Sequence, residues 1–211
     1  MNRMIKRILI ITVLIILSQS AYAQEHRIGI GLGSSSGVYR SNNQETDLTG
    51  ELLELPSYVY SSKIGFAVGF KILEFSVKGK QETPLLKTKL AYSQTILAMT
   101  LGYEFKIGDS LIFSPQLIRS YMGSSKLDYS TYSVNTYYTS EGKDVVLSAN
   151  SITGDADLSG YELPIYFVTK NYFWGIKLCW YKSEDKLILA DNSEVEIDTY
   201  GGLQFLVETK F

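Results

Sequence analysis

The sequence predicts an all-β protein, an eight-stranded antiparallel up-and-down transmembrane β-barrel preceded by a cleavable signal peptide. Three observations predict it. Apolar and polar residues alternate with a period of two, one face of the alternating segments is almost free of charge, and the chain begins with a short apolar segment. The 211 residues include one His and one Cys, which disfavours metal sites and disulfide scaffolds. We expect no cofactor.

The N-terminal segment has the three parts of a secretory signal. Residues 1–7 carry three basic side chains, residues 8–17 are almost all apolar, and Ala21 and Ala23 form a small-residue cleavage pattern. A membrane anchor is the rival interpretation. However, ten helical residues span about 15 Å, half of the hydrocarbon core. We therefore predict a signal peptide over 1–23, cleaved after Ala23, and one barrel domain over 24–211.

The strands are predicted from apolar residues at alternate positions. Eight runs result: 28–32, 58–72, 75–77, 91–107, 111–117, 161–167, 174–180 and 195–211. Short turns are expected around Ile72-Leu73, after Ile107 and around Lys170-Asn171, and long polar connections elsewhere. Pro115 and Pro164 lie inside predicted strands, where each removes a ladder donor, so we expect bulges or broken ladders there.

The direction of the apolar face distinguishes a membrane barrel from a soluble sandwich. On that face we find two charged residues, Arg119 and Lys182, which we place at the outer rim as snorkelling cations. Aromatic residues also sort into two groups, as at the two surfaces of a bilayer. The outer group is Tyr58, Tyr60, Tyr121, Tyr161 and Trp180. The inner group is Phe70, Tyr103, Phe105, Phe113, Phe167, Trp174 and Phe205.

The end of the chain resembles bacterial outer-membrane β-barrels. Phe205, Val207 and the terminal Phe211 are similar to the signal that the outer-membrane assembly machinery reads. Glu162-Leu163-Pro164 resembles the E-x-P strand of PorT-type barrels of Bacteroidetes, and Glu54-Leu55-Pro56 echoes it. The resemblance implies an OmpA/OmpX-like barrel in the outer membrane of a Gram-negative bacterium. It implies no catalytic residues.

The polar face predicts a lumen plugged by side chains, because eight strands leave an interior that side chains can fill. The candidate network is Lys63, Glu104, Gln116, Glu162, Lys177 and Gln204, with Glu162 and Lys177 close enough to pair. A long outer loop over 122–157 carries Tyr129, Tyr132, Tyr137 and Tyr138, a composition typical of recognition surfaces.

These features favour a structural or surface-interaction role. The expected partners are outer-membrane lipids and lipopolysaccharide, the assembly machinery and an unidentified extracellular ligand. A nucleic-acid partner is disfavoured by the net charge of −2. A narrow conduit for small solutes or hydrophobic molecules and a soluble lipocalin-like carrier are the alternatives. We expect no enzyme, because the single His, His26, lies at the predicted periplasmic end.

Overall fold

The computed structural model describes residues 25–41, 44–83, 85–133, 145–189 and 194–211. The predicted signal peptide, residues 1–23, lies outside this part of the chain. Among the described residues, no helix is long and apolar enough to cross a membrane.

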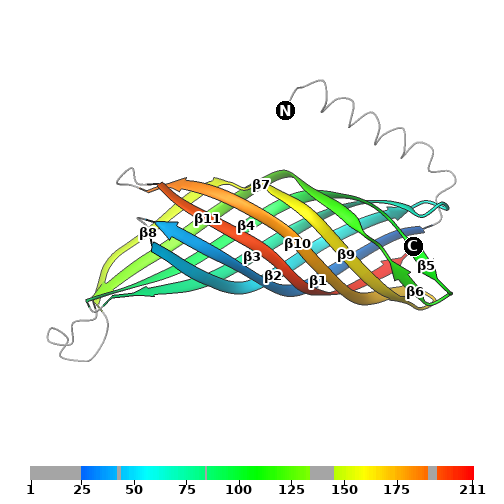
Figure 1. The fold of residues 1–211 in the computed structure, drawn as a ribbon, viewed down its shortest axis with the longest axis horizontal. Helices are drawn as coiled ribbons and strands as arrows, with labels where there is room; N and C mark the ends of the chain where they lie inside the picture. Colours follow the sequence, from blue (N-terminus) through cyan, green and yellow to red (C-terminus); the bar gives the residue numbers. More distant parts are fainter. Residues whose placement is uncertain (1–24, 42–43, 84, 134–144, 190–193) are drawn as a thin grey trace, which may run out of the picture.

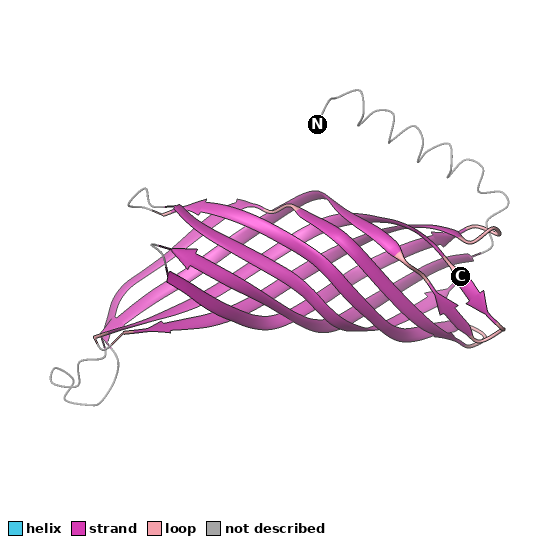
Figure 2. Ribbon diagram, viewed as in Figure 1, coloured by secondary structure: helices cyan, strands magenta, loops and turns pink. Residues whose placement is uncertain are grey.

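Antiparallel strands make up nearly all of the described chain (Figures 1 and 2). Their bounds are β1 (Glu25–Ser41), β2 (Gln44–Ser61), β3 (Phe66–Glu82), β4 (Leu86–Tyr103), β5 (Phe105–Ile107), β6 (Leu111–Phe113), β7 (Gln116–Ser133), β8 (Val145–Asp155), β9 (Leu158–Val168), β10 (Tyr172–Ile188) and β11 (Glu194–Lys210). β1, β2, β3, β4, β7, β9, β10 and β11 pair in this order, and β11 returns to β1. The result is the predicted closed ring of 8 strands.

The ring is an elongated cylinder whose strands run obliquely to its long axis (Figure 1). The chain end at Phe211 lies beside the start of β1, where the Phe211 backbone N–H donates to the His26 carbonyl at 3.2 Å. We call this the terminal end and the opposite one the distal end. A strand of 17 residues, tilted by roughly 40°, spans about 43 Å along the axis. The wall is therefore much taller than an apolar band of about 25 Å.

The first turn at the terminal end lies ten residues before its predicted position. Residues 58–72 are not one run, because the chain reverses at Ser62–Gly65. There the Gly65 N–H donates to the Ser62 carbonyl at 3.0 Å. Gly65 has φ 91°, which a residue with a side chain adopts only with strain. Ile72-Leu73 lies in the middle of β3. Tyr58 and Tyr60 are therefore at the terminal end, not at the predicted outer one.

The outward face of the wall changes polarity partway along the strands. On β3 the outward residues are Phe66, Val68, Phe70 and Ile72, followed by Glu74, Ser76 and Lys78. The last apolar outward residues before the change are Leu32, Leu53, Ile72, Leu97, Leu117, Tyr161, Trp180 and Leu203. We call the outward surface from these residues to the terminal end the apolar belt, and the part of the barrel beyond them the distal half.

The inward face changes in the opposite sense. On β3, Lys71 is buried in the lumen, and the next inward residues are Leu73, Phe75 and Val77. The predicted outward placement of Phe75 and Val77 is therefore wrong, since Phe75 is 1% exposed. The distal half has the arrangement of a water-soluble β-protein, with apolar side chains inside and charged side chains outside.

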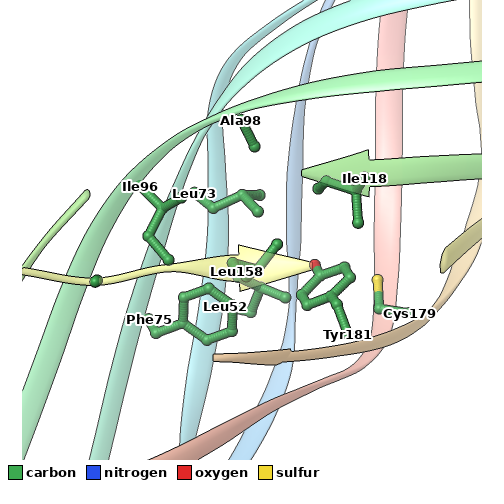
Figure 3. Packing of buried hydrophobic residues seen from close by; sticks show 10 residues of the cluster. Leu52, Leu73, Phe75, Ile96, Ala98, Ile118, Leu158, Cys179 and Tyr181 are labelled. Carbon is green, nitrogen blue, oxygen red and sulfur yellow. The ribbon is translucent and has the colours of Figure 1, made fainter. Parts of the chain in front are cut away.

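Two apolar clusters fill the distal half. The first surrounds Phe75 and Tyr181, whose rings pack edge to face at 6.0 Å (Figure 3). Its other members are Leu52, Leu73, Ile96, Ala98, Ile118, Ala156, Leu158 and Cys179. The second lies further toward the distal end and contains Tyr39, Leu48, Val77, Leu90, Tyr92, Leu127, Leu187, Val195 and Ile197. Together they close the distal lumen with side chains.

The two prolines expected to disturb the ladder do so at the same place. Ser114 and Pro115 separate β6 from β7, and Pro164 on β9 faces this gap. Pairing of β9 with β7 ends at Glu162, and pairing with β6 resumes at Ile165. Between these two ladders, the Ser114 N–H donates to the Pro164 carbonyl at 3.0 Å.

The predicted loop over 122–157 is mostly strand. β7 continues to Ser133 and pairs with β8 from Ser124↔Asp155 to Ser133↔Val145. Within the described residues, the long connection thus forms a hairpin that continues the wall beyond the apolar belt.

Candidate functional site

The lumen within the apolar belt contains two buried clusters of charged residues. In the first, Arg27 on β1 binds Glu104 beyond the end of β4 and lies 3.3 Å from Glu208 on β11. Ser61 donates to Glu104 at 2.6 Å, and Tyr166 donates to Glu208 at 2.7 Å. Because β1 and β4 are not neighbours in the ring, the Arg27–Glu104 contact crosses the lumen.

One glycine and two aromatic rings lie around the Arg27–Glu208 pair. A Cβ at Gly29 would lie 2.5 Å from Glu208 Cγ, so only glycine fits there. The Arg27 guanidinium carbon lies 5.1 Å from the centroid of the Tyr166 ring and 4.6 Å from that of Phe173. These distances are typical of cation–π contacts.

The second cluster is a square of four charges with no net charge. Lys71 lies 3.3 Å from Glu54 and 2.8 Å from Glu162. Lys177 lies 3.3 Å from Glu162 and also binds Glu54. All four side chains are buried. Each lysine therefore has one partner on an adjacent strand and one across the lumen.

The two E-x-P segments supply the acidic members of this square. Glu54 precedes Pro56 on β2, and Glu162 precedes Pro164 on β9. Each glutamate is followed by a lysine on the next strand, Lys71 on β3 and Lys177 on β10. The two segments thus occupy matching positions on opposite walls of the barrel.

The structure places five of the six predicted network residues inside the barrel. Glu104, Gln116, Glu162, Lys177 and Gln204 are buried, and Glu162 contacts Lys177 as expected. They do not form one network. Gln116 donates to Ser114 at 3.0 Å, and Gln204 accepts from Cys179 Sγ at 3.5 Å.

Lys63 is the exception, because it lies exposed in the turn between β2 and β3. Within the belt, four charged lumen residues were not among the candidates: Arg27, Glu54, Lys71 and Glu208. Three of them lie on the polar face that the alternation defines. Glu54 was missed as a lumen residue because residues 33–57 were predicted to be a connection rather than strands. Its E-x-P motif was the one signal in the sequence that could have identified it.

A buried polar layer separates the two apolar clusters of the distal half. Gln94 donates to Tyr92 Oη and to Ser183 Oγ, both at 2.7 Å, and accepts from Thr199 at 2.8 Å. Tyr92 also donates to Asp185. Burial and the neighbouring Asp185 carboxylate raise the pKa of Tyr92 well above its ordinary value, so Tyr92 is a neutral donor at physiological pH.

The outer surface just beyond the apolar belt carries the two predicted rim cations. Arg119 lies 2.7 Å from Asp157, with both side chains exposed. Lys182 lies 2.7 Å from Glu184 and 3.2 Å from Asp198. Asp198 also accepts from Arg40 at 2.6 Å. Burial opposes ionisation of Asp198, but hydrogen bonds from Arg40 and Lys182 outweigh it and lower the pKa of this carboxyl.

The predicted outer-loop tyrosines have different environments. Tyr129 packs against the second apolar cluster and accepts from Asn150 at 3.0 Å. Tyr132 lies under Lys89, whose Nζ is 4.6 Å from the ring centroid. Tyr137 and Tyr138 lie outside the described residues. Tyr129 is therefore largely part of the inner packing rather than an open contact.

At the terminal end, Phe205, Val207 and Phe211 point outward and are exposed. His26 Nδ1 lies 2.6 Å from Tyr58 Oη, and its ring packs near Tyr60 and Phe211. Among the described residues, no group of three or more His, Cys, Asp or Glu could hold a metal ion.

No protein-family model matches the chain, and no curated protein does. Several solved structures resemble it. Ail from Yersinia pestis, in complex with the heparin analogue sucrose octasulfate, is 13% identical over 89% of this chain and 100% of its own, with a TM-score of 0.43. Neisserial surface protein A is 13% identical over 90% and 99%, with a TM-score of 0.44. OprG from Pseudomonas aeruginosa is 10% identical over 90% and 97%, with a TM-score of 0.36.

Proposed function

We propose that the chain is an integral outer-membrane protein whose apolar belt lies in the bilayer and whose distal half projects from the cell. The observation that carries the proposal is the change of outward polarity partway along the walls of the barrel. On β7 the change is less sharp, because Tyr121 and Met122 are exposed beyond Arg119. At the outward positions of the described belt strands, no Asp, Glu, Lys or Arg is present, and exposed charges such as Lys63 and Lys210 lie in turns or at strand ends. A Lys or Arg facing lipid at the midplane costs about 2–4 kcal/mol, which explains its exclusion.

The dimensions of the belt support this placement. On most strands it covers seven to nine residues, for example Phe66–Ile72 on β3. That length corresponds to about 20 Å along the axis of a tilted barrel, close to the height of the apolar band of known barrels. Tyr161 and Trp180 lie at its distal margin, and Tyr103 and Trp174 lie toward its terminal margin. Aromatic residues favour these interfacial depths.

The belt adjoins the terminal end, so only short turns project on that side. Outer-membrane barrels keep short turns in the periplasm and longer segments outside. We therefore assign the terminal end to the periplasm, as expected for a chain whose segment 1–23 is a cleaved signal. Arg119 and Lys182 would then lie at the level of lipopolysaccharide phosphates, and the assembly machinery would read Phe205, Val207 and Phe211.

The proposed role is structural or surface-interacting, with a sealed lumen and the β7–β8 hairpin as the contact surface for an extracellular ligand. Charged side chains and a small apolar cluster of Ile112, Tyr166, Phe173 and Leu206 fill the lumen inside the belt, and two apolar clusters fill it beyond. The seal is therefore partly apolar, not only polar as the sequence suggested. A soluble lipocalin-like carrier would hold its apolar residues inside at every level, which disfavours this alternative.

Cell fractionation with gel mobility tests the proposal. The chain should sediment with the outer membrane, and unheated samples in SDS should migrate differently from boiled ones, because a closed barrel resists SDS. Recovery in the soluble fraction, or identical mobility before and after boiling, would contradict it.

A narrow conduit for hydrophobic molecules is the second candidate, favoured by one hollow at the proline break. The hollow, of about 520 Å³, is lined mainly by apolar residues of the belt, including Leu101, Pro115 and Trp180. It reaches the otherwise buried Gln116 and Glu162. Uptake of a hydrophobic fluorescent probe by cells with and without the protein separates the two candidates: a sealed barrel leaves the uptake rate unchanged, whereas a conduit for hydrophobic molecules raises it.

We also propose kinship with PorT-type barrels, supported by the two E-x-P segments and their shared lysines. If the motif marks this kinship, other members should carry a lysine on the strand after each E-x-P glutamate. A set of PorT-type sequences without those lysines would contradict the proposal.

A further inference from the structure

The polar layer of the distal half holds a carboxylate with no basic partner. Asp185 on β10 is 1% exposed and lies between the two apolar clusters. Tyr92 donates to one of its oxygens, and the other, Oδ1, has no hydrogen-bond partner. Among the described residues, no Lys, Arg or His forms an ion pair with it. Burying an uncompensated carboxylate is costly, and a bound positive charge would offset that cost.

The groups around Asp185 present oxygen atoms. Tyr92, Ser183 and Thr199 contribute hydroxyl oxygens, and Gln94 contributes an amide. Ser125 on β7 is buried as well, and its hydroxyl lies beside the phenol of Tyr92. Neutral oxygens around one carboxylate suit a hard cation, and a single positive charge balances the site.

The polar layer lies beside a break in the hydrogen-bonded sheet. Pairing of β10 with β9 ends at Ser183↔Leu158, and β8 pairs with β7. Among the described residues, no ladder joins β8 to residues 184–188 of β10. Gly154 on β8 lies at this seam, where a Cβ would meet Leu187 Cδ2 at 2.4 Å and Ser125 Oγ at 3.3 Å.

We propose that this layer binds an alkali-metal cation of the size of Na⁺, held by Asp185 with hydroxyl oxygens from Tyr92 and Ser125. The cation neutralises the carboxylate between the two apolar clusters and joins β10 to β4 and β7. It enters through the seam between β8 and β10. The site belongs to the distal half and does not depend on the conduit or the membrane assignment.

Equilibrium urea unfolding of the detergent-solubilised barrel tests the site, with NaCl compared with choline chloride at equal ionic strength. One site that only the folded state binds raises the folding equilibrium constant by 1 + [Na⁺]/Kd. Above half-saturation, a tenfold increase in Na⁺ should therefore raise the constant up to tenfold, while choline should not.

Asp185→Asn should abolish the Na⁺ response, and Asp155→Asn, which removes an exposed charge on β8, should retain it. If Asp185→Asn does not fold, Ser125→Ala and Tyr92→Phe provide the test, because each removes one oxygen and should weaken the response. Equal effects of Na⁺ and choline would overturn the proposal. An unchanged Na⁺ response in the variants would overturn it as well.

Discussion

At the level of single residues, the lumen shows how a barrel wall tolerates buried charge. Glu54, Glu162, Lys71 and Lys177 have no net charge together, and each lysine contacts both glutamates. Removing one partner of such a buried set leaves an uncompensated charge, which is far more costly than removing a neutral pair.

Lys177→Met should therefore destabilise the barrel by about 3–5 kcal/mol. The double variant Lys177→Met, Glu54→Gln should be more stable than the single one, because Lys71 and Glu162 then remain as a balanced pair. Lys186→Met is the control, on the same strand but outside, where loss of its exposed ion pair with Glu194 costs up to about 1 kcal/mol. Urea unfolding in detergent measures all three, and strictly additive effects of the two lumen substitutions would count against the square.

Asp198 gives the outer surface a defined pH dependence. Its pKa is lowered in the folded state, because hydrogen bonds from Arg40 and Lys182 outweigh the effect of burial. A lowered folded pKa stabilises above the unfolded value of about 3.9, and this stabilisation is lost as the pH falls through the folded pKa.

The stability difference between the wild type and Asp198→Asn should thus be constant near neutral pH and shrink below about pH 4. Unfolding measured between pH 3 and 7 checks this. Asp47→Asn, on the exposed outward face of β2, is the matched control. A difference that grows toward low pH would contradict the assigned sign.

At the level of strands, each wall segment passes between two surroundings. Sequence alternation located the segments around Leu97–Ile107, Tyr161–Phe167 and Trp174–Trp180 correctly, because there the apolar side faces outward. It failed for 33–57 and 74–82, where the apolar side turns inward and the outward side is charged. Alternation alone does not show whether the apolar side of a strand faces the lumen or the outside. Phe75 and Val77 were therefore placed on the wrong side.

The contacts of the candidate site were predictable only in part. Glu162 and Lys177 lie on adjacent strands of the correctly predicted part, so their contact followed from the sequence. The Arg27–Glu104 contact crosses the lumen between strands that are distant in sequence. Periodicity contains no information on such pairs.

Two substitutions on β1 test the strand-level account. Ile30 and Ser36 both point outward, but Ile30 lies in the apolar belt and Ser36 beyond it. Ile30→Lys should destabilise the folded barrel in lipid vesicles by about 2–4 kcal/mol, and Ser36→Lys by much less. Equal costs at the two positions would show that they share one environment.

At the level of the whole molecule, the protein is one closed barrel whose two halves differ in the polarity of their interiors. The half near the termini has a polar lumen and an apolar exterior, and the distal half reverses both. In the proposed placement, the bilayer surrounds the apolar belt, and about half of the wall is available for contacts outside the cell.

The most direct test is cysteine labelling along the outward face of β4 in intact cells, in a Cys179→Ala background. Ser93 and Leu101 are both outward and exposed, but only Ser93 lies beyond the belt. A membrane-impermeant maleimide should label Ser93→Cys and spare Leu101→Cys. Labelling of both positions, or of Leu101→Cys alone, would contradict the placement of the belt in the membrane.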